Sequence, residues 1–453
     1  MGSVVSLVRS VWALSYAVHS ALVLALIGVA IKGPPTKNQR ANLVLSLFNN
    51  QMAELPLTVI LLNACFYVWL TITGTARESA IVRFFNYINV ISTIGLLYLF
   101  KRSFEAKESA DKFLIQLSKE GKKHVELPGP NSPAFWKQAL NPIPFPQDYT
   151  KYDSIPYWSL QEQRSAMNSD GWKSVLEMAL DVYKPNSVQG GDDRPVFIHI
   201  HGGGWTQGSK SWPGPILTEL ISRKWVVVSI DYRLSAKAGY PTQLIDCKRA
   251  LRWVKDEIRI FGGDPNNVIV GGNSSGGHMA ALLALTPNLP EYQPGFEDVD
   301  TTVQGCVPQS AALDLTDMNN YGHHDGKGRF IKDVAHREGS PMSPENINFM
   351  KEHSPIFKLK DAKVPFLVVH GDLDLISPVQ TARDFVKEFQ SKSEASVSYL
   401  EIPDAHHAFE VYSSPRSWYT IMAVAEWLEF HFDKKQTGGK NKVQVHELVE
   451  WEY

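Results

Sequence analysis

Apolar residues gather in three long stretches within the first hundred residues of the chain. The stretches that contain no Asp, Glu, Lys or Arg are residues 11–31, 55–73 and 84–100. A membrane-spanning helix needs about 20 consecutive apolar residues. The first stretch meets that length, the second comes close despite Pro56, and the third is shorter and contains Asn86 and Asn89. We therefore predict an integral membrane region over residues 1–100 with up to three helices, in which the third is either a span or a buried helix.

A cleaved signal peptide is the alternative interpretation of the first stretch. Its apolar region is long, however, and no small-x-small cleavage site precedes the basic segment at Lys32. We expect a retained anchor, and a multi-pass arrangement more than a single span.

Basic residues follow the first and the third stretch, and they indicate the orientation. They are Lys32, Lys37, Arg40, Lys101, Arg102 and Lys107. Because Lys and Arg concentrate on the cytosolic side, three spans would put the amino terminus outside and the following domain in the cytosol. Arg77 and Arg83 lie between the second and third stretches and count against this topology. A single span would instead place the domain in a lumen.

The remaining chain changes character twice. Residues 101–171 are polar and then Pro-rich, which predicts a linker and cap segment. Short, nearly continuous apolar runs then recur, as in strands covered on both faces: residues 196–200, 225–230, 268–270 and 366–369. Between them, Ala250, Val254 and Ile258 recur at helical spacing. Alternating strands and helices predict a doubly wound α/β domain with a mostly parallel sheet over residues 172–435, followed by a tail at 436–453.

Charge and cysteine content exclude several classes of function. The chain has 45 Lys and Arg against 47 Asp and Glu, so it lacks the basic field of a nucleic-acid-binding protein. Its three cysteines are too widely spaced for a disulfide framework or a zinc site. We predict no nucleic-acid partner, no metal and no cofactor.

The most informative motif is the run Gly272-Asn273-Ser274-Ser275-Gly276, which follows an apolar strand and precedes an apolar helix. G-x-S-x-G in this context is the pattern of a nucleophile elbow, where a sharp turn lifts the serine hydroxyl above the sheet edge. A structural turn is the alternative. We predict that Ser274 is the nucleophile of a serine hydrolase.

A second glycine-rich motif, His201-Gly202-Gly203-Gly204-Trp205, follows the strand at 196–200. Glycines leave backbone N–H groups unshielded, so that they can point at an oxyanion on an attacked carbonyl. A flexible turn would give the same composition. Its place after an early strand and ahead of the serine favours an oxyanion loop.

Serine nucleophiles need a histidine base and an acid that orients it, and in this class both follow the serine, the acid first. The strand at 366–369 leads to the candidate acids Asp372 and Asp374, and a strand at 397–402 leads to the candidate bases His406 and His407. Both pairs fall after the carboxyl end of a strand, where α/β sheets place their sites.

Together these motifs resemble the hormone-sensitive lipase family of α/β-hydrolases, which includes arylacetamide deacetylases and microbial carboxylesterases. The resemblance covers residues 176–433 and implies an α/β-hydrolase fold with a cap. Its pattern selects Asp374 and His407 for the triad with Ser274. It further implies that Gly203, Gly204 and the N–H of Ser275 form the oxyanion hole. The chain has Asn273 where relatives often have Asp.

The predicted function is hydrolysis of carboxylic esters through an acyl-enzyme, with a small lipophilic ester as substrate because of the membrane region. Amide or acetyl-group hydrolysis, or acyl transfer to an alcohol, would use the same residues and stays open. A non-catalytic protein that keeps the fold as a ligand pocket is the alternative of another class. The oligomeric state is left open.

Overall fold

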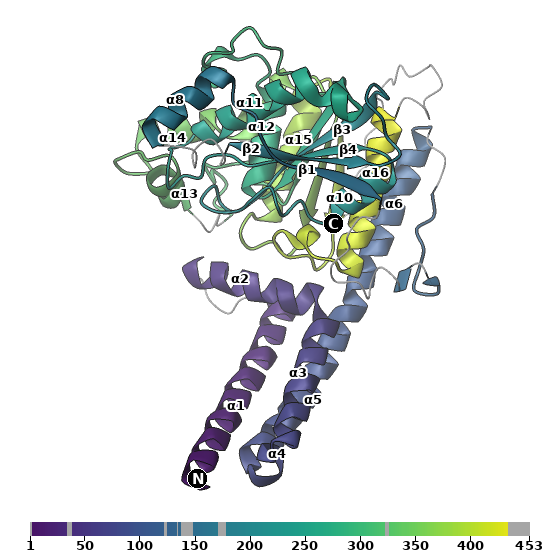
Figure 1. Ribbon diagram of the computed structural model, residues 1–453, viewed down its shortest axis with the longest axis vertical. Coiled ribbons are helices and arrows are strands. Elements are labelled where there is room, and N and C mark those ends of the chain that lie inside the picture. Colours follow the sequence, from purple (N-terminus) through teal and green to yellow (C-terminus); the bar gives the residue numbers. More distant parts are fainter. Residues whose placement is uncertain are drawn as a thin grey trace.

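The computed structural model has two parts, an α/β domain and a bundle of long helices that projects from it (Figure 1). The described residues are 2–33, 39–121, 125–133, 135–136, 148–170, 178–321 and 326–433.

A single eight-stranded sheet forms the centre of the α/β domain. Its strands are β1 (Tyr149–Pro156), β2 (Ala179–Pro185), β3 (Arg194–Ile200), β4 (Val226–Ile230), β5 (Gly263–Asn273), β6 (Gly305–Gln309), β7 (Phe366–Gly371) and β8 (Val397–Ile402). Their order is β1-β2-β4-β3-β5-β6-β7-β8. The pairs β1–β2 and β2–β4 are antiparallel, and the pairs from β4 to β8 are parallel. The predicted mostly parallel sheet is confirmed.

Helices cover both faces of this sheet because its strands are apolar on both sides. On one face the core includes Ile198 of β3 together with α11 (Thr242–Glu257), α12 (Ser275–Leu285) and α15 (Val379–Lys392). On the other face, Phe197 packs in a core with α6 (Ala106–Lys119), α10 (Pro215–Ser222) and α16 (Pro415–Phe432). Neighbouring residues of a strand point to opposite faces, so each strand contributes to both cores.

Short helices lie between these elements. They are α8 (Leu160–Asp170), α13 (Gly326–Arg329), α14 (Pro344–Glu352), η2 (Ile258–Phe261), η3 (Pro290–Tyr292), η4 (Phe330–Val334), η5 (Pro355–Phe357), η6 (Leu359–Asp361) and η7 (Phe409–Val411). Several fall between β6 and β7.

The structure differs from the sequence prediction over residues 101–171, which we expected to be a linker and cap segment. Part of this range is regular: α6 packs on α16, and β1 extends the sheet by pairing with β2. The apolar positions of α6 form a stripe that includes Phe113, Leu114 and Leu117, all buried. The polar residues between them make the segment look like a linker when its packing partner is unknown.

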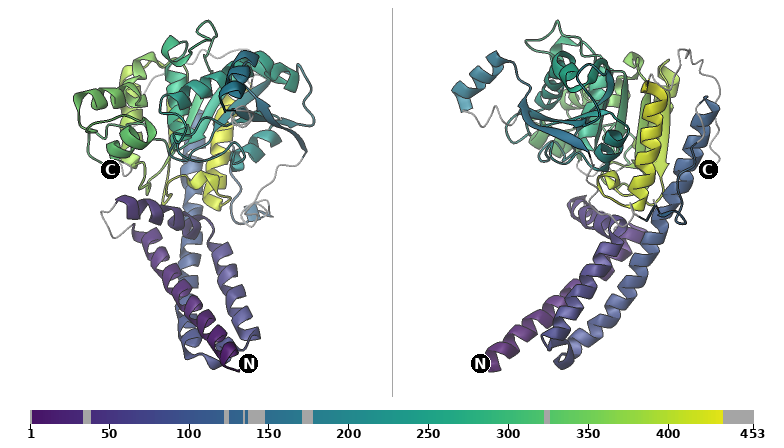
Figure 2. Two further views of the ribbon diagram at one scale, coloured as in Figure 1. Left: turned by 60° about the vertical axis from the view of Figure 1, so that its left-hand side comes forward. Right: turned by 45° about the vertical axis from the view of Figure 1, so that its right-hand side comes forward.

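The projecting bundle consists of α1 (Gly2–Lys32), α2 (Gln39–Glu54), α3 (Pro56–Ile72), α4 (Thr75–Glu78) and α5 (Ala80–Arg102). Helix α5 continues through η1 (Ser103–Glu105) into α6 and reaches the α/β domain beside α16 (Figure 2). Two helical segments, Val4–Lys32 and Ala80–Lys119, are long and apolar enough to cross a membrane. Residues Phe48–Glu54 and Pro56–Ile72 form a pair bent by 98° that would make a third crossing if counted as one span.

Polar side chains inside the bundle connect its helices. His19 Nε2 of α1 lies 2.7 Å from Asn63 Oδ1 of α3. Asn89 of α5 donates to the Ser20 hydroxyl of α1 over 2.8 Å. Such hydrogen bonds between helices stabilise bundles whose outer surface is apolar. Asn89, which shortens the apolar stretch in the sequence, therefore faces the interior of the bundle.

Candidate active site

Ser274 occupies a strained turn between β5 and α12. Its backbone has φ 55° and ψ −122°, a conformation that non-glycine residues rarely adopt. The turn also needs glycine on either side: a Cβ on Gly272 would lie 2.2 Å from the carbonyl oxygen of Ile200, and one on Gly276 would lie 2.1 Å from the same atom. The turn is therefore held closely against β3, as the predicted elbow requires.

A continuous chain of hydrogen bonds runs from Ser274 into the protein. The Ser274 hydroxyl lies 2.8 Å from Nε2 of His407, and Nδ1 of His407 lies 2.8 Å from Oδ2 of Asp374. The three residues come from the ends of β5, β8 and β7, which meet at the carboxyl edge of the parallel sheet. This order of hydroxyl, imidazole and carboxylate is the arrangement in which a serine can be deprotonated.

The Asp374 carboxylate is fully buried and ionised. Its Oδ1 accepts hydrogen bonds from the backbone N–H groups of Ile376 (2.9 Å) and Ser377 (2.8 Å). Burial alone would raise the pKa of Asp374, but the charge of His407 and the hydrogen bonds from His370 and His407 hold it well below its ordinary value. A permanent negative charge therefore faces the imidazole.

The same interaction acts on His407 in the opposite direction. Burial tends to lower the pKa of His407, but the Asp374 carboxylate outweighs it and raises the pKa above 6.5. An imidazole in this position accepts a proton readily and keeps the resulting charge beside a carboxylate.

The other two candidates from the sequence lie outside this chain of hydrogen bonds. Nε2 of His406 is 3.2 Å from the carbonyl oxygen of Ala30, away from the serine. The N–H of Asp372 donates to the carbonyl of Ile402 (3.1 Å), and burial together with the charge of Asp404 raises the pKa of the Asp372 carboxyl to about 6. The structure thus brings together Ser274, His407 and Asp374, the three that the family resemblance selects.

The glycine-rich loop after β3 lies against the elbow. Gly203 and Gly204 have φ 129° and 59°, and a Cβ on Gly203 would lie 2.0 Å from the carbonyl oxygen of Gln207. The N–H of Gly202 donates to the Asn273 side chain over 3.1 Å. Asn273, the departure from the family pattern, therefore connects the two loops.

The third predicted oxyanion donor, Ser275, also lies here. Ser275 begins α12, and the first N–H groups of a helix have no partner within it. Behind the loop, the Tyr232 hydroxyl donates to the carbonyl of His201 (3.0 Å), and the two rings stack with centroids 4.3 Å apart. Burial lowers the pKa of His201 to about 4, so this ring is neutral and supports the loop.

Sequence reasoning missed two charged residues beside the site. A Cβ on Gly204 would lie 3.3 Å from the guanidinium of Arg329, which also donates to the Thr206 hydroxyl. Glu410 is buried three residues after His407 and accepts a hydrogen bond from the Ser310 hydroxyl over 3.1 Å. The only sequence signal for Glu410 is its nearness to His407, and Arg329 has none.

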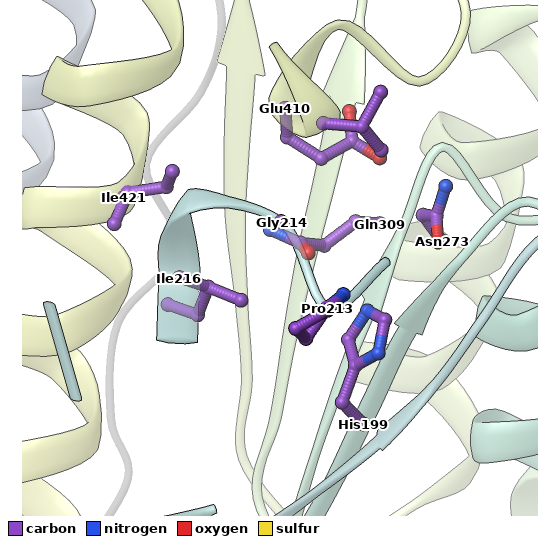
Figure 3. A pocket seen from close by; sticks show the side chains of 9 residues that line it. His199, Pro213, Gly214, Ile216, Asn273, Gln309, Glu410 and Ile421 are labelled. Carbon is purple, nitrogen blue, oxygen red and sulfur yellow. The ribbon is translucent and has the colours of Figure 1, made fainter. Parts of the chain in front are cut away.

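Glu410 lines a small cavity next to the elbow (Figure 3). The cavity has a volume of about 10 Å³ and is lined by His199, Pro213, Gly214, Ile216, Asn273, Gln309, Glu410, Val411 and Ile421. A space of this size holds about one water molecule.

In the described part of the chain, no group of three or more His, Cys, Asp or Glu side chains is arranged to hold a metal ion.

The mostly parallel sheet and the turn at Ser274 define the class of fold: the domain has an α/β-hydrolase fold. The BD-FAE family model matches residues 180–389. Esterase LipQ of Mycobacterium tuberculosis is 34% identical over 59% of this chain and 63% of its own length. The probable carboxylic ester hydrolase LipM of the same organism is 35% identical over 58% of this chain and 60% of its own length. Through this region the chain is similar to the BD-FAE family and to these two mycobacterial esterases.

More distant matches cover similar shares of the chain. Isoprenylcysteine alpha-carbonyl methylesterase ICME of Arabidopsis thaliana is 26% identical over 52% of this chain and 54% of its own length. The structure of a bifunctional GH43-CE protein of Bacteroides eggerthii is 19% identical, with a TM-score of 0.50 over 61% of this chain and 35% of that one, a likeness of fold alone. The match spans less than two thirds of each of these relatives' own length.

Proposed function

We propose that this protein is a serine hydrolase that cleaves carboxylic esters through an acyl-enzyme. The observation that carries the proposal is the hydrogen-bond chain Ser274–His407–Asp374, with both steps at 2.8 Å, at a strained elbow beside a glycine-rich loop. The names of its relatives, esterase and carboxylic ester hydrolase, support the same reaction.

In the proposed reaction, His407 takes the hydroxyl proton as Ser274 attacks the ester carbonyl, and Asp374 stabilises the imidazolium that forms. His407 then gives this proton to the departing alcohol, which leaves an acyl group on Ser274. In the second half, His407 takes a proton from water as the water attacks the acyl carbonyl. The proton returns to Ser274 as the acid is released.

The oxyanion of each tetrahedral intermediate needs donors near Ser274. We assign this role to the N–H groups of Gly203, Gly204 and Ser275. Gly202 supports the assignment, because a Cβ there would lie 3.2 Å from Cβ of Ser274, so the loop passes directly beside the nucleophile. Donors held by backbone geometry need no rearrangement as the negative charge forms.

The test is the variant Ser274→Ala, assayed as the full chain on esters of graded acyl length and on matched amides. We expect ester turnover to fall by several orders of magnitude, since loss of a triad member removes most of the rate enhancement. Labelling by a fluorophosphonate probe should disappear in parallel. Turnover near the wild-type level would refute the proposal, and faster cleavage of amides than of esters would reassign the reaction to amide hydrolysis.

We further propose that the bundle of α1, α3 and α5 spans a membrane and that the substrate is a lipophilic ester. Support comes from the large apolar side chains that the bundle leaves exposed, such as Leu7, Leu61 and Ile94, each more than 60% exposed. A surface of this kind on several helices needs a cover of lipid. The 29 residues of Val4–Lys32 extend about 43 Å, enough to cross a hydrocarbon core of about 30 Å.

The orientation proposed is cytosolic for the α/β domain. Lys32, Lys101 and Arg102 lie at the domain end of the bundle, where further basic residues follow in the sequence, and basic residues favour the cytosol. In sealed vesicles with the cytosolic face outward, a tag at the carboxyl terminus should be digested by added protease. A protected tag would place the domain in a lumen, and extraction of the protein by carbonate would refute the membrane spans themselves.

A further inference from the structure

The segment that carries His407 connects β8 to α16, and both of its ends are attached to the helical bundle. At its start, Nε of Arg102 in α5 donates to Oδ2 of Asp404 over 2.6 Å. At its end, Glu54 in α2 forms an ion pair with Arg416 in which both side chains are fully buried. The Ser414 hydroxyl donates to the same Glu54 carboxylate over 2.5 Å. The bundle and the catalytic domain are therefore joined at this segment.

The bundle also contacts the segment at its two histidines. His406 lies against the end of α1, where its Nε2 is 3.2 Å from the carbonyl oxygen of Ala30. The side-chain amide of Asn50 in α2 donates to the backbone carbonyl of His407 over 2.6 Å. Asn50 is only 4% exposed, so water cannot readily replace this hydrogen bond. A residue of the bundle thus holds the backbone of the proposed base directly.

Helix α2 presents one buried face to the catalytic domain. Residues on this face are Ser46, Asn49, Asn50, Ala53 and Glu54, which recur at helical spacing and are all buried. Met52, on another face, packs with apolar residues of α1 and α5. The face toward the catalytic domain is therefore mostly polar.

The backbone around His407 needs such restraint because it is strained. Ala408 has φ 56° and ψ 34°, and Asp404 has φ 54°, in the left-handed region that disfavours residues with a Cβ. A strained conformation persists only where its surroundings hold it in place. On the domain side, the N–H of Ala408 donates to the Ser310 hydroxyl over 3.2 Å. Asn50 provides the matching contact from the bundle side, on the carbonyl of the same peptide unit.

We propose that Asn50 is a positioning residue for His407, so that the amino-terminal helical region takes part in setting the catalytic geometry. The inference rests on the proposed esterase function. The carbonyl that Asn50 holds belongs to the peptide unit after His407, and the direction of the imidazole depends on that unit. The 2.8 Å contact between Nε2 and Ser274 tolerates little displacement, since about 1 Å of misplacement costs on the order of a hundredfold in rate.

The test compares Asn50→Leu with Asn49→Leu, each in the full-length protein in detergent on a short, water-soluble ester. Leucine has the same branched skeleton as asparagine but no donor. Asn49 is a matched control because it is adjacent and equally buried, and its side chain has no hydrogen bond to the described residues. We expect Asn50→Leu to lower kcat at least tenfold with KM within twofold, and Asn49→Leu to keep kcat within twofold. Equal losses in the two variants would overturn the proposal.

A second comparison separates positioning from a general structural effect. If Asn50 acts through His407, Asn50→Leu should cause no further loss of the residual activity in a His407→Ala background. A further loss of the same size as in the wild type would overturn the proposal. If Asn50→Leu does not accumulate as folded protein, Asn50→Ala removes the same donor and takes its place with the same expected outcomes.

The outcomes also separate this inference from the proposed function. Activity that survives Ser274→Ala would refute the hydrolase itself. Activity that requires Ser274 but is unchanged in Asn50→Leu would refute only the role of Asn50.

Discussion

Replacing Glu410 with glutamine should change how the stability of the protein depends on pH. Glu410 is buried beside the elbow, and burial raises the pKa of its carboxyl from the ordinary value of 4.5 to about 7. Its Oε2 accepts a hydrogen bond from the Ser310 hydroxyl, and a glutamine amide oxygen can accept the same bond. The substitution therefore removes a titrating group and keeps the shape and the acceptor.

The sign and size follow from proton linkage. Below pH 4.5 the carboxyl is protonated in both the folded and the unfolded state, so it has no effect on stability. Between pH 4.5 and 7 the unfolded chain loses its proton first, and the folded state is increasingly disfavoured. At about 1.4 kcal/mol per pH unit, the penalty reaches about 3 kcal/mol above pH 7. Glutamine has no such penalty, so the variant should be more stable at high pH.

The assay is unfolding of wild type and Glu410→Gln in detergent across pH 4.5 to 8. We expect the two proteins to be equally stable near pH 4.5. As the pH rises, the free energy of unfolding of the variant should exceed that of the wild type by a growing amount, up to about 3 kcal/mol at pH 8. Glu394→Gln, which removes an exposed carboxylate, should show no such trend. A stability difference that does not vary with pH, or a wild type that is the more stable at pH 8, would refute the argument. Because the Glu410 charge also helps to raise the pKa of His407, the acid limb of kcat/KM should move to lower pH in the variant.

Three further changes test the site and its attachment. Asp374→Asn should lower kcat by about 10⁴-fold, as loss of a triad acid does elsewhere, whereas Asp372→Asn should have a small effect; the reverse result would move the acid by two residues. Gly203→Ala places a Cβ 2.0 Å from a backbone carbonyl oxygen and should lower kcat about a hundredfold. An unchanged kcat would indicate that the loop is only a turn and has no role in binding the oxyanion. Glu54→Gln leaves the buried Arg416 unpaired and should lower the free energy of unfolding by about 3–5 kcal/mol. Adding Arg416→Met should restore most of the lost free energy of unfolding. A double variant no more stable than the single one would contradict the pairing of Glu54 with Arg416.

Much of the fold was predictable because its signals are local. The apolar run at residues 196–200 lies within β3, the run at 268–270 lies within β5, and Ser274 follows β5 directly. A strand, a serine with a glycine two positions away on either side and an apolar helix in succession favour a sharp turn at the edge of a sheet, so the sequence order predicted the elbow. The linker prediction over residues 101–171 was less successful. The apolar stripe of α6 can be recognised as a packing face only when its partner, α16, is known.

Residue spacing alone could not decide which of two neighbouring aspartates is the acid and which of two neighbouring histidines is the base. Asp372 and Asp374 lie in one turn after β7, and His406 and His407 are adjacent, so each pair reaches the same edge of the sheet. A resemblance to a family selected one of each. The structure separates them through contacts from distant segments: Ala30 engages His406, while Ser274 and Asp374 engage His407.

The sequence by itself determined the class of fold, the three apolar stretches and the elbow, since these depend on periodicity and on short motifs. Only the tertiary structure decided that the helical bundle and the catalytic domain meet at the His407 segment. Asn50 and His407 are separated by 357 positions, and nothing in either neighbourhood marks them as partners. Their contact depends on how the bend after α2 and the long α5–α6 helix orient the bundle against α16, which is a property of packing between elements and not of any one of them.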